Sequence, residues 1–305
     1  MTKITVIGSA NVDLVARVPY IPEPGETIIG ADFMQAMGGK GANQAVAAAR
    51  LGGDVTFVAR VGSDAFGEAC ILAYSAAGIA THGVLRTTGM TTGIALIGVA
   101  DNGENSIIVV PGANHALSPA DIDAQAEAIQ SADVVLLQLE TPLETVQRAV
   151  DIAYAAGRTI ILNPAPYQPL PRALLEKISV LTPNLTEAGQ LLGDALYEDS
   201  MMAQSLLGLG AQSVVMTEGA NGAQVAGSLG HVKVPAYPVQ AVDSTGAGDA
   251  FNAALGLALA EGRSLHQAAE FAAAAAALSV TKIGAQPSLP TRADVDAFLN
   301  RQTTA

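Results

Sequence analysis

Short apolar runs alternate with longer, helix-like segments along most of this chain. The runs are nearly continuous in apolar residues, which is typical of strands buried on both faces of a parallel sheet. They occupy Ile4–Ile7, Val55–Val61, Val134–Leu139, Thr159–Leu162, Val180–Leu181 and Ser213–Thr217. Segments rich in Ala, Leu and Glu predict helices over Gly41–Leu51, Phe66–Ala77, Pro119–Ser131, Leu143–Ala156 and Thr186–Leu192. Strand–helix alternation on this scale predicts an α/β sandwich.

Several helix ends are marked by their own residues. Ser118-Pro119 supplies an N-cap followed by proline at the first helical position, and Gly157 or Gly193 can close a helix in the left-handed conformation. Beyond Asp249 the chain is expected to be mainly helical to its end. The Ala-rich run Phe271–Val280 indicates a buried helix that packs closely through small side chains.

Two stretches break the α/β alternation. Asp13–Met37 holds alternating residues interrupted by prolines and glycines, and it lacks helical periodicity. Thr92–Val99 and Ser106–Val110 flank the turn signal Asp101-Asn102-Gly103-Glu104, which predicts a hairpin. Each piece is too short for a core of its own. We therefore expect one domain over residues 1–305, with lid insertions at roughly 13–37 and 92–110.

The composition limits the classes of partner that the protein is expected to bind. The 305 residues are half hydrophobic, and the formal net charge of -13 argues against nucleic acid and against an anionic membrane surface. No apolar segment approaches the roughly 20 residues that span a bilayer. Cys70 is the single cysteine, and the N-terminal residues do not resemble a signal peptide, so a cytoplasmic setting is expected.

The strongest candidate for chemistry is Asp243–Phe251, a Gly-rich turn before a long apolar run. Such a turn directs backbone N–H groups and the positive end of a helix dipole at one point, which suits a phosphate or a developing oxyanion. Gly246, Ala247 and Gly248 would form that anion hole, and Asp249 would accept a proton. The alternative is a plain helix start, in which the dipole favours the Asp249 carboxylate.

A second Gly-rich turn, Met37–Ala45, also enters a predicted helix. Lys40 follows the glycine pair without the Walker spacing, so this is not a P-loop. Glycine lets a ligand approach the backbone, and Asn43 offers both a donor and acceptors, which suits vicinal hydroxyls. A loop-to-helix junction with a solvated Asn43 is the alternative.

Polar residues at the predicted ends of strands complete the candidate site. Asn11 and Asp13 point to one side of an extended segment, where a polyol can face both, and Glu140 follows a buried strand. A turn-forming Asn11 and an exposed Glu140 are the alternatives. In Asn184-Leu185-Thr186-Glu187 the polar ends can meet phosphate oxygens and hydrated Mg²⁺, or simply cap a helix. Thr217–Gly222 either borders a nucleotide or forms an ordinary hairpin.

Together these motifs resemble the ribokinase-like family of sugar kinases, from the first strand to Ser288. Gly38–Asn43 and Asp243–Asp249 are the most specific of them. The resemblance implies a three-layer α/β sandwich with a mostly parallel central sheet and a small β-sheet lid. It also implies a homodimer formed through the lid.

The resemblance also implies roles for individual residues. Asp249 would be the general base, and the pentose would be contacted by Asn11, Asp13, Gly39, Lys40, Asn43 and Glu140. ATP would be surrounded by Asn184, Thr217, Glu218, Gly219, Ala220, Asn221, Gly222, Gly248 and Asp249, and Glu187 would belong to the Mg²⁺-associated motif. An activating monovalent cation, K⁺, would be held largely through backbone carbonyls by Asp243, Thr245, Ser279, Lys282, Gly284 and Ser288.

The chain departs from the family pattern in three places. Ser244 replaces a usual Thr, Leu185 replaces a frequent Glu, and Ala273 stands near the adenine where a polar residue is common. The resulting hypothesis is transfer of the γ-phosphoryl group of ATP to the 5-hydroxyl of D-ribose, giving D-ribose 5-phosphate. Alternatives are a kinase for deoxyribose, fructose or adenosine, or a non-catalytic sugar-binding protein. A nicotinamide-dependent dehydrogenase is disfavoured because the dinucleotide fingerprint is absent.

Overall fold

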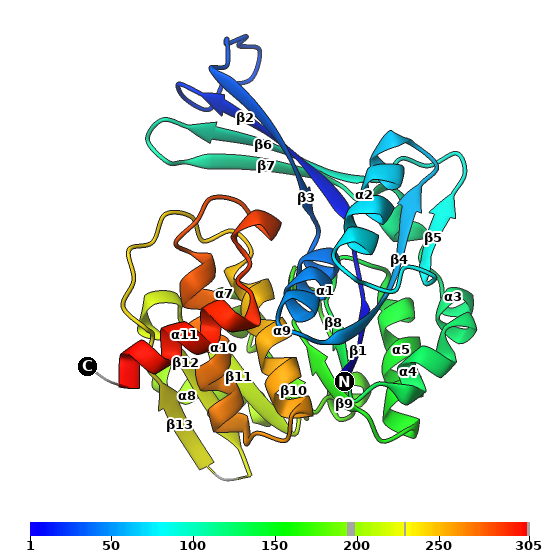
Figure 1. Cartoon of the computed structure of the whole chain (residues 1–305), viewed down its shortest axis with the longest axis vertical. Coiled ribbons are helices and arrows are strands. Elements are labelled where there is room, and N and C mark those ends of the chain that lie inside the picture. Colours follow the sequence, from blue (N-terminus) through cyan, green and yellow to red (C-terminus); the bar gives the residue numbers. More distant parts are fainter. Residues whose placement is uncertain (194–198, 229, 304–305) are drawn as a thin grey trace.

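The predicted apolar runs pair side by side in one large sheet of nine strands (Figure 1). The structure is a computed structural model that describes residues 1–193, 199–228 and 230–303. In spatial order the strands are β13 (Gly230–Val234), β12 (Ala223–Gly227), β11 (Ser213–Thr217), β10 (Val180–Leu181), β9 (Thr159–Leu162), β8 (Val134–Leu137), β1 (Lys3–Ile7), β4 (Asp54–Gly62) and β5 (Val84–Thr87). Pairing is parallel from β11 to β5, and β12 and β13 add an antiparallel edge. The prediction of a mostly parallel central sheet is confirmed.

Helices cover both faces of this sheet because successive strand residues point to opposite sides. Val6 packs in one apolar cluster and Ile7 in the other. The first cluster holds residues of α1 (Lys40–Arg50), α2 (Ala65–Ala76), α9 (Ala247–Ala260), α10 (Leu265–Ser279) and α11 (Arg292–Thr303). The second holds residues of α3 (Pro119–Ala124), α4 (Ala126–Ser131), α5 (Leu143–Ala155), α6 (Arg172–Leu175), α7 (Leu185–Leu191) and α8 (Asp199–Leu207). The three-layer sandwich is therefore confirmed, and the Ala-rich run lies in buried α10.

Some predicted boundaries are wrong. The single helix predicted over residues 119–131 is two helices, α3 and α4, because the Gln125 N–H donates to the Ile122 carbonyl at 3.0 Å and interrupts the helical ladder. The strand predicted to reach Leu139 ends at Leu137, after which the Leu139 N–H donates to Ala165 instead. The Ser118 cap is confirmed.

The two irregular stretches form a separate four-stranded sheet that projects from one end of the molecule (Figure 1). Its order is β3 (Asp32–Gly38), β2 (Asn11–Val18), β6 (Gly93–Ala100) and β7 (Asn105–Val110). The predicted hairpin is the antiparallel pair β6–β7. We call this sheet the lid. It starts two residues earlier than expected, since Asn11 and Val12 already pair with Gly38 and Met37.

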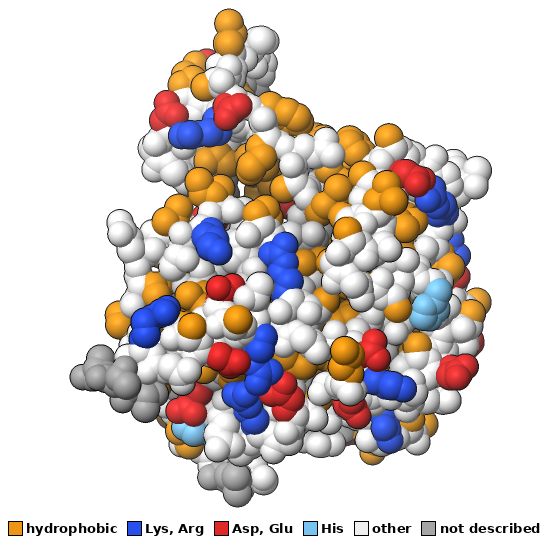
Figure 2. Space-filling model, viewed as in Figure 1, with side chains coloured by type: hydrophobic (Ala, Val, Ile, Leu, Met, Phe, Trp, Pro, Cys, Tyr) orange, Lys and Arg blue, Asp and Glu red, His pale blue; other side chains and the backbone are white. Residues whose placement is uncertain are grey.

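Apolar side chains are unusually exposed on the lid (Figure 2). All of β7 is exposed, including Ile107, Ile108 and Val109, and so is Phe33 of β3. At the base of the lid, in contrast, side chains are buried. Cys70 of α2 is fully buried, and its Sγ lies 3.6 Å from the Met37 Sδ. The lid is thus anchored at one end and uncovered at the other.

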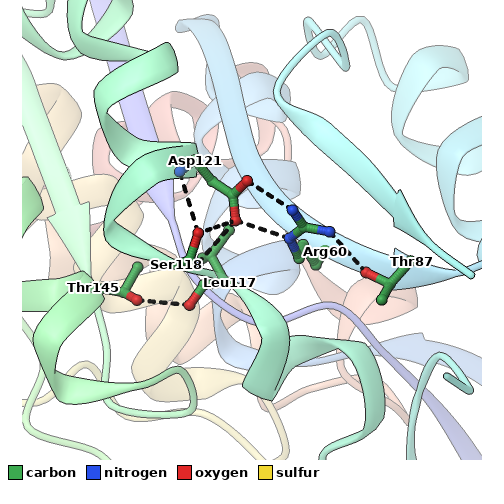
Figure 3. A network of polar contacts seen from close by, with 6 residues as sticks. All are labelled: Arg60, Thr87, Leu117, Ser118, Asp121 and Thr145. Atoms are coloured by element: carbon green, nitrogen blue, oxygen red, sulfur yellow. Dashed lines mark hydrogen bonds and ion pairs between the residues drawn. The ribbon is translucent and has the colours of Figure 1, made fainter.

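Polar contacts join β4 of the large sheet to α3. Arg60 of β4 donates from Nε and Nη2 to the two carboxylate oxygens of Asp121, at 2.8 and 2.7 Å (Figure 3). Its Nη1 donates to Thr87 of β5. Asp121 also accepts from Ser118, so one carboxylate connects a strand and a helix cap. Within the described ranges, no helix is long and apolar enough to cross a membrane.

Candidate active site

The Asp249 carboxylate lies where the first turn of α9 meets α1. It is 6% exposed. Asn43 donates from Nδ2 to Oδ2 at 2.9 Å, and Gln44 donates from Nε2 to Oδ1 at 3.1 Å. The two Gly-rich motifs of the sequence therefore meet at one carboxylate. Asn43 is not solvated as the alternative reading required, because it is buried and bonded to Asp249.

Burial raises the pKa of Asp249 to about 6, against the lowering effects of Lys40 and of the Asn43 and Gln44 amides. Burial, followed by the charges of Glu140 and Asp249, likewise raises the pKa of Asp13 to about 6. For Lys40, burial lowers the pKa, but the surrounding carboxylates outweigh it and leave the pKa above its ordinary value. The site is a group of mutually repelling carboxylates around one ammonium, which is typical of a functional site.

The start of α1 is shaped by glycine and held by a carboxylate. Gly39 has φ +88°, and a Cβ there would lie 2.8 Å from the Asn11 nitrogen. Glu140 Oε2 accepts from the Lys40 N–H at 2.9 Å and from the Ser9 hydroxyl. Glu140 is thus placed inside the site rather than in an exposed loop. The part played by Ser9 was missed, because its partner lies far away in the sequence.

Asn11 and Asp13 enter the site from β2. Asn114, which the sequence did not single out, donates from Nδ2 to Asn11 Oδ1 at 2.7 Å. That contact orients the Asn11 amide so that its own NH₂ group is left to donate elsewhere. The Asp13 carboxylate fills the space over Gly38, where a Cβ would come within 2.3 Å of both oxygens. Nothing local in the sequence signals Asn114, since only the fold brings it to β2.

The turn before α9 offers fewer free N–H groups than predicted. Gly246 is the N-cap residue with φ +79°. The Ala247 N–H donates to the Ser244 carbonyl at 3.2 Å, so the prediction that Ala247 belongs to a free anion hole is corrected. Gly248 is exposed, and a Cβ there would meet nothing within 4 Å. Space for a ligand therefore lies beside Gly248.

A cavity of about 440 Å³ opens on that side. Among the predicted nucleotide residues it is lined by Thr217, Gly219, Ala220, Gly222 and Gly248. Ala273 also lines it, together with residues that the sequence reading missed, such as Tyr237, Val239, Phe251, Ala276 and Val280. Most of this lining is apolar and suits a planar base.

The other predicted nucleotide residues have different surroundings. Glu218 does not line the cavity, because its carboxylate accepts from Gln224 and pairs with Lys233 at 3.4 Å. Asn221 is likewise absent from the lining. Asn184 and Glu187 form a reciprocal capping box at the start of α7, as in the alternative reading. Glu187 still adds its charge to the surroundings of Lys40.

The predicted cation loops do come together. Asp243 Oδ1 accepts from the Thr245 N–H at 2.9 Å, and Oδ2 accepts from the Gly284 N–H at 2.8 Å. The Ser279 and Ser288 hydroxyls donate to Ala276 and Ala285, so only their remaining oxygen lone pairs and nearby carbonyls could face an ion. The Lys282 N–H donates to the Ser279 carbonyl at 3.3 Å. In the described parts of the chain, no three His, Cys, Asp or Glu side chains cluster as a metal site.

Comparison with known proteins agrees with this geometry. Residues 1–292 match the family described as pfkB family carbohydrate kinase. Ribokinase of Haemophilus influenzae is 44% identical over 97% of this chain and 98% of its own length. Ribokinase of Bacillus subtilis is 42% identical over 98% of this chain and 100% of its own. Deoxyribokinase of Salmonella typhimurium is 38% identical over 97% and 98%.

Solved structures give the same result for the fold. A ribokinase of Thermotoga maritima has a TM-score of 0.92 at 36% identity, covering 98% of this chain and 100% of that one. A ribokinase of Arabidopsis thaliana, complexed with ribose and ATP, has a TM-score of 0.91 at 35% identity, covering 98% and 99%. The expected ribokinase-like fold is confirmed.

Proposed function

Because this chain belongs to the pfkB family of carbohydrate kinases, we propose that it transfers the γ-phosphoryl group of ATP to the 5-hydroxyl of D-ribose. The observation that carries the proposal is the buried Asp249 carboxylate, placed between the Asn43 amide and the glycine turn at the start of α9. The relatives named ribokinase, and the solved relative that holds ribose and ATP, support this choice of substrates.

The sugar would lie against β2 and the start of α1. The Asn43 Oδ1 is buried and has no partner among the described residues, so it is available to accept from a sugar hydroxyl. Asn11 would donate from its NH₂ group, and Asp13 and Glu140 would accept from further hydroxyls. Gly39 and Lys40 would complete the contacts through the backbone and the ammonium.

The phosphates would lie between this sugar and the apolar cavity. Positioning and charge stabilisation dominate phosphoryl transfer, since little covalent help is needed in a loose transition state. Asp249 would take the hydroxyl proton, and the Gly246 and Gly248 N–H groups would face the transferring oxygens. Mg²⁺ bound with ATP would neutralise phosphate charge, and Glu187, whose charge acts on Lys40, would hold the ion through water.

The loops around Asp243 would hold K⁺. Their fit rests on a carboxylate whose pKa is lowered, despite burial, by hydrogen bonds from Thr245 and Gly284. A monovalent ion beside Asp243 would fix the Gly246 turn without contacting substrate. We further propose one domain over residues 1–305, a cytoplasmic setting and a homodimer formed through the lid.

A panel of sugars tests the proposal. D-ribose, 2-deoxy-D-ribose, D-fructose and adenosine would each be offered with Mg-ATP, with and without K⁺, and ADP release measured. We expect D-ribose to give the highest kcat/KM, and K⁺ to raise it. Deoxyribose is the second candidate because a relative of 38% identity is named deoxyribokinase. A preference for deoxyribose or adenosine would make that compound the substrate in place of ribose. ADP release that none of the four acceptors increases would refute a sugar kinase.

A further inference from the structure

Two glutamine side chains lie behind the Asp249 carboxylate, on the side away from solvent. Gln44 of α1 and Gln138, just beyond β8, are both completely buried. Gln138 donates from Nε2 to Gln44 Oε1 at 2.7 Å, and Gln44 donates from Nε2 to Asp249 Oδ1 at 3.1 Å. The base is thereby connected to the end of a central strand through two amides, neither of which a solvent-borne ligand can reach.

Hydrogen-bond chemistry gives this chain of amides one direction. An ionised carboxylate can only accept, so Gln44 must present its NH₂ group to Asp249. Its carbonyl then faces Gln138, which must donate in turn. This leaves Gln138 Oε1 buried without a partner among the described residues. Turning either amide over would set two oxygens, or two NH₂ groups, against each other.

The backbone leaves room for this arrangement at Gly8. A Cβ on Gly8, directly after β1, would lie 2.1 Å from Gln138 Oε1 and 2.9 Å from the Gly41 Cα. Both distances are too short for any side chain. Gly8 therefore leaves the space that Gln138 fills between the end of β1 and the start of α1.

We propose that Gln44 and Gln138 are positioning residues for Asp249, and that they reserve its Oδ2 as the atom that accepts the substrate proton. The inference rests on the proposed function. Oδ1 keeps a donor that no substrate can displace, because Gln44 is buried. Among the described residues, Oδ2 accepts a hydrogen bond from Asn43 alone, whose amide also faces the proposed sugar.

Proton transfer and phosphoryl transfer occur in one step. The hydroxyl O–H bond breaks and its proton forms a bond with Oδ2. The electron pair left on the hydroxyl oxygen attacks the γ-phosphorus, and ADP leaves with the electrons of the broken P–O bond. Asp249 ends the step protonated at Oδ2, with Gln44 still donating to Oδ1.

The charges around Asp249 explain why a neutral donor matters. Lys40 from α1 favours the ionised carboxylate, whereas Glu140, beyond β8, and Asp13 of β2 oppose it, together with burial. Gln44 stabilises the ionised form without adding charge. Removing its donor should therefore raise the pKa of Asp249 and move the acidic limb of the pH profile to higher pH.

We call the hydrogen-bonded chain from Gln138 through Gln44 to Asp249 the relay. Three variants test it: Gln44→Met, Gln138→Met and the double variant. Methionine has similar volume and cannot donate a hydrogen bond. In Gln44→Met we expect kcat to fall about 10²-fold at most, the lower end of general-base effects, with KM for the sugar nearly unchanged. The acidic limb of kcat/KM should move up by about one pH unit. Gln138→Met should give a smaller change in the same direction, and no further shift once Gln44 is already Met.

The matched control is Gln224→Met, which removes a buried glutamine on β12 whose described hydrogen bonds join Glu218 and His231. It should leave the acidic limb in place. If Gln44→Met does not fold, Gln44→Asn takes its place, because its amide is one methylene too short for both neighbours. An active Gln44 variant with an unmoved acidic limb overturns the relay and leaves the proposed function intact.

A measurement without turnover separates the two proposals. The ¹³C carboxyl signal of Asp249, assigned by its loss in Asp249→Asn, can be titrated in the unliganded protein. The signal should titrate at higher pH in Gln44→Met than in the unchanged protein, whether or not any sugar is phosphorylated. Equal titration in both proteins overturns the relay, and absence of kinase activity in the unchanged protein overturns the proposed function alone.

Discussion

At the scale of single residues, the site combines a carboxylate that should be ionised with surroundings that oppose its charge. Asp249 is buried near Glu140 and Asp13, whereas Lys40 and two amides favour its ionised form. A base whose pKa lies just below the working pH is well suited to proton transfer. Its placement costs folding free energy, however, because a buried carboxylate with a raised pKa is less stable than in the unfolded chain.

Replacing this carboxylate should therefore change activity and stability in different ways. Asp249→Asn should lower kcat by roughly 10²–10⁴-fold. The folded pKa of about 6 lies above the ordinary 3.8, so the unchanged protein loses stability as pH rises between these values. Asp249→Asn lacks that loss, so its unfolding free energy relative to the unchanged protein should increase between pH 4 and pH 7.

Urea unfolding at several pH values measures that difference, and an ADP-release assay measures kcat. Asp54→Asn, an exposed carboxylate at the start of β4, is the control for loss of one charge. Near-normal turnover in Asp249→Asn would contradict its role as the base. A stability difference that does not vary with pH would contradict the raised pKa.

At this scale the sequence predicts a site residue only where the residue stands within a recognisable local motif. Asp249 and Asn43 could be found because glycines beside them mark sharp turns into helices. Gln44, Gln138 and Asn114 could not, since a glutamine or asparagine in an apolar run carries no sign of the distant polar partner that it meets. The same limit explains why the surroundings of Glu218 were not predicted. Its partners Gln224 and Lys233 lie on strands whose pairing is set by the fold.

At the scale of elements, helix starts are tied to neighbouring segments by capping carboxylates. Asp64 caps α2, accepting from the Gly67 N–H at 2.8 Å. The same carboxylate accepts from the N–H and the hydroxyl of Thr92, the residue before β6. One side chain thus fixes both a helix start and the base of the lid.

Asp64→Ala should lower the unfolding free energy by about 1–2 kcal/mol, the usual effect of losing such a cap. Hydrogen bonds from Thr92 and Gly67 hold the pKa of Asp64 below its ordinary value, although burial opposes them. A lowered carboxylate pKa gives stability at neutral pH that is lost as pH falls through the folded pKa. The difference between Asp64→Ala and the unchanged protein should therefore shrink below about pH 4.

Urea unfolding at pH 7 and pH 3 checks both parts of this prediction. Asp64→Asn is the matched variant, since its carbonyl can still cap α2 and it should lose less stability at pH 7 than the alanine variant. An alanine variant as stable as the unchanged protein would show that the cap contributes nothing.

The elements themselves were largely predictable, and their ends were less so. Strands buried on both faces reveal themselves as apolar runs, so β1, β4, β8, β9, β10 and β11 were expected. β5, β13 and the break between α3 and α4 were not. In β5 only Val84 is buried, and β13 is exposed except at Val234, so neither shows the continuous apolar pattern of the central strands.

At the scale of the whole molecule, strand order is the feature that local pattern could not supply. β1 lies between β8 and β4, and the antiparallel edge is added beyond β11. Such an order depends on which helices cross which face, and periodicity within a segment does not record it. The resemblance to a family supplied only a mostly parallel central sheet with a β lid, and the order of the strands comes from the structure.

The uncovered lid leads to a prediction about assembly. Ile107 and Ile108 are 53% and 61% exposed, and as neighbours on β7 they point to opposite faces of the lid. Burial of these faces against a second lid would remove apolar area from water. We expect the unchanged protein to have twice the mass of one chain by light scattering, and the double variant Ile107→Lys/Ile108→Lys to have the mass of one.

Leu72→Lys, which charges a similarly exposed apolar residue on α2, should leave the mass unchanged. A double variant of dimer mass would show that subunits do not pair through the lid. An unchanged protein with the mass of one chain would remove the homodimer from the proposal.

The burial of Cys70 beneath the lid has a practical consequence. Its thiol contacts Met37 of β3, and burial raises its pKa to about 11, so a thiol reagent should react slowly while these segments stay together. The chain has a single cysteine, so no competing site would contribute to the labelling signal. The rate of alkylation would then report how often β3 separates from α2 in the native protein.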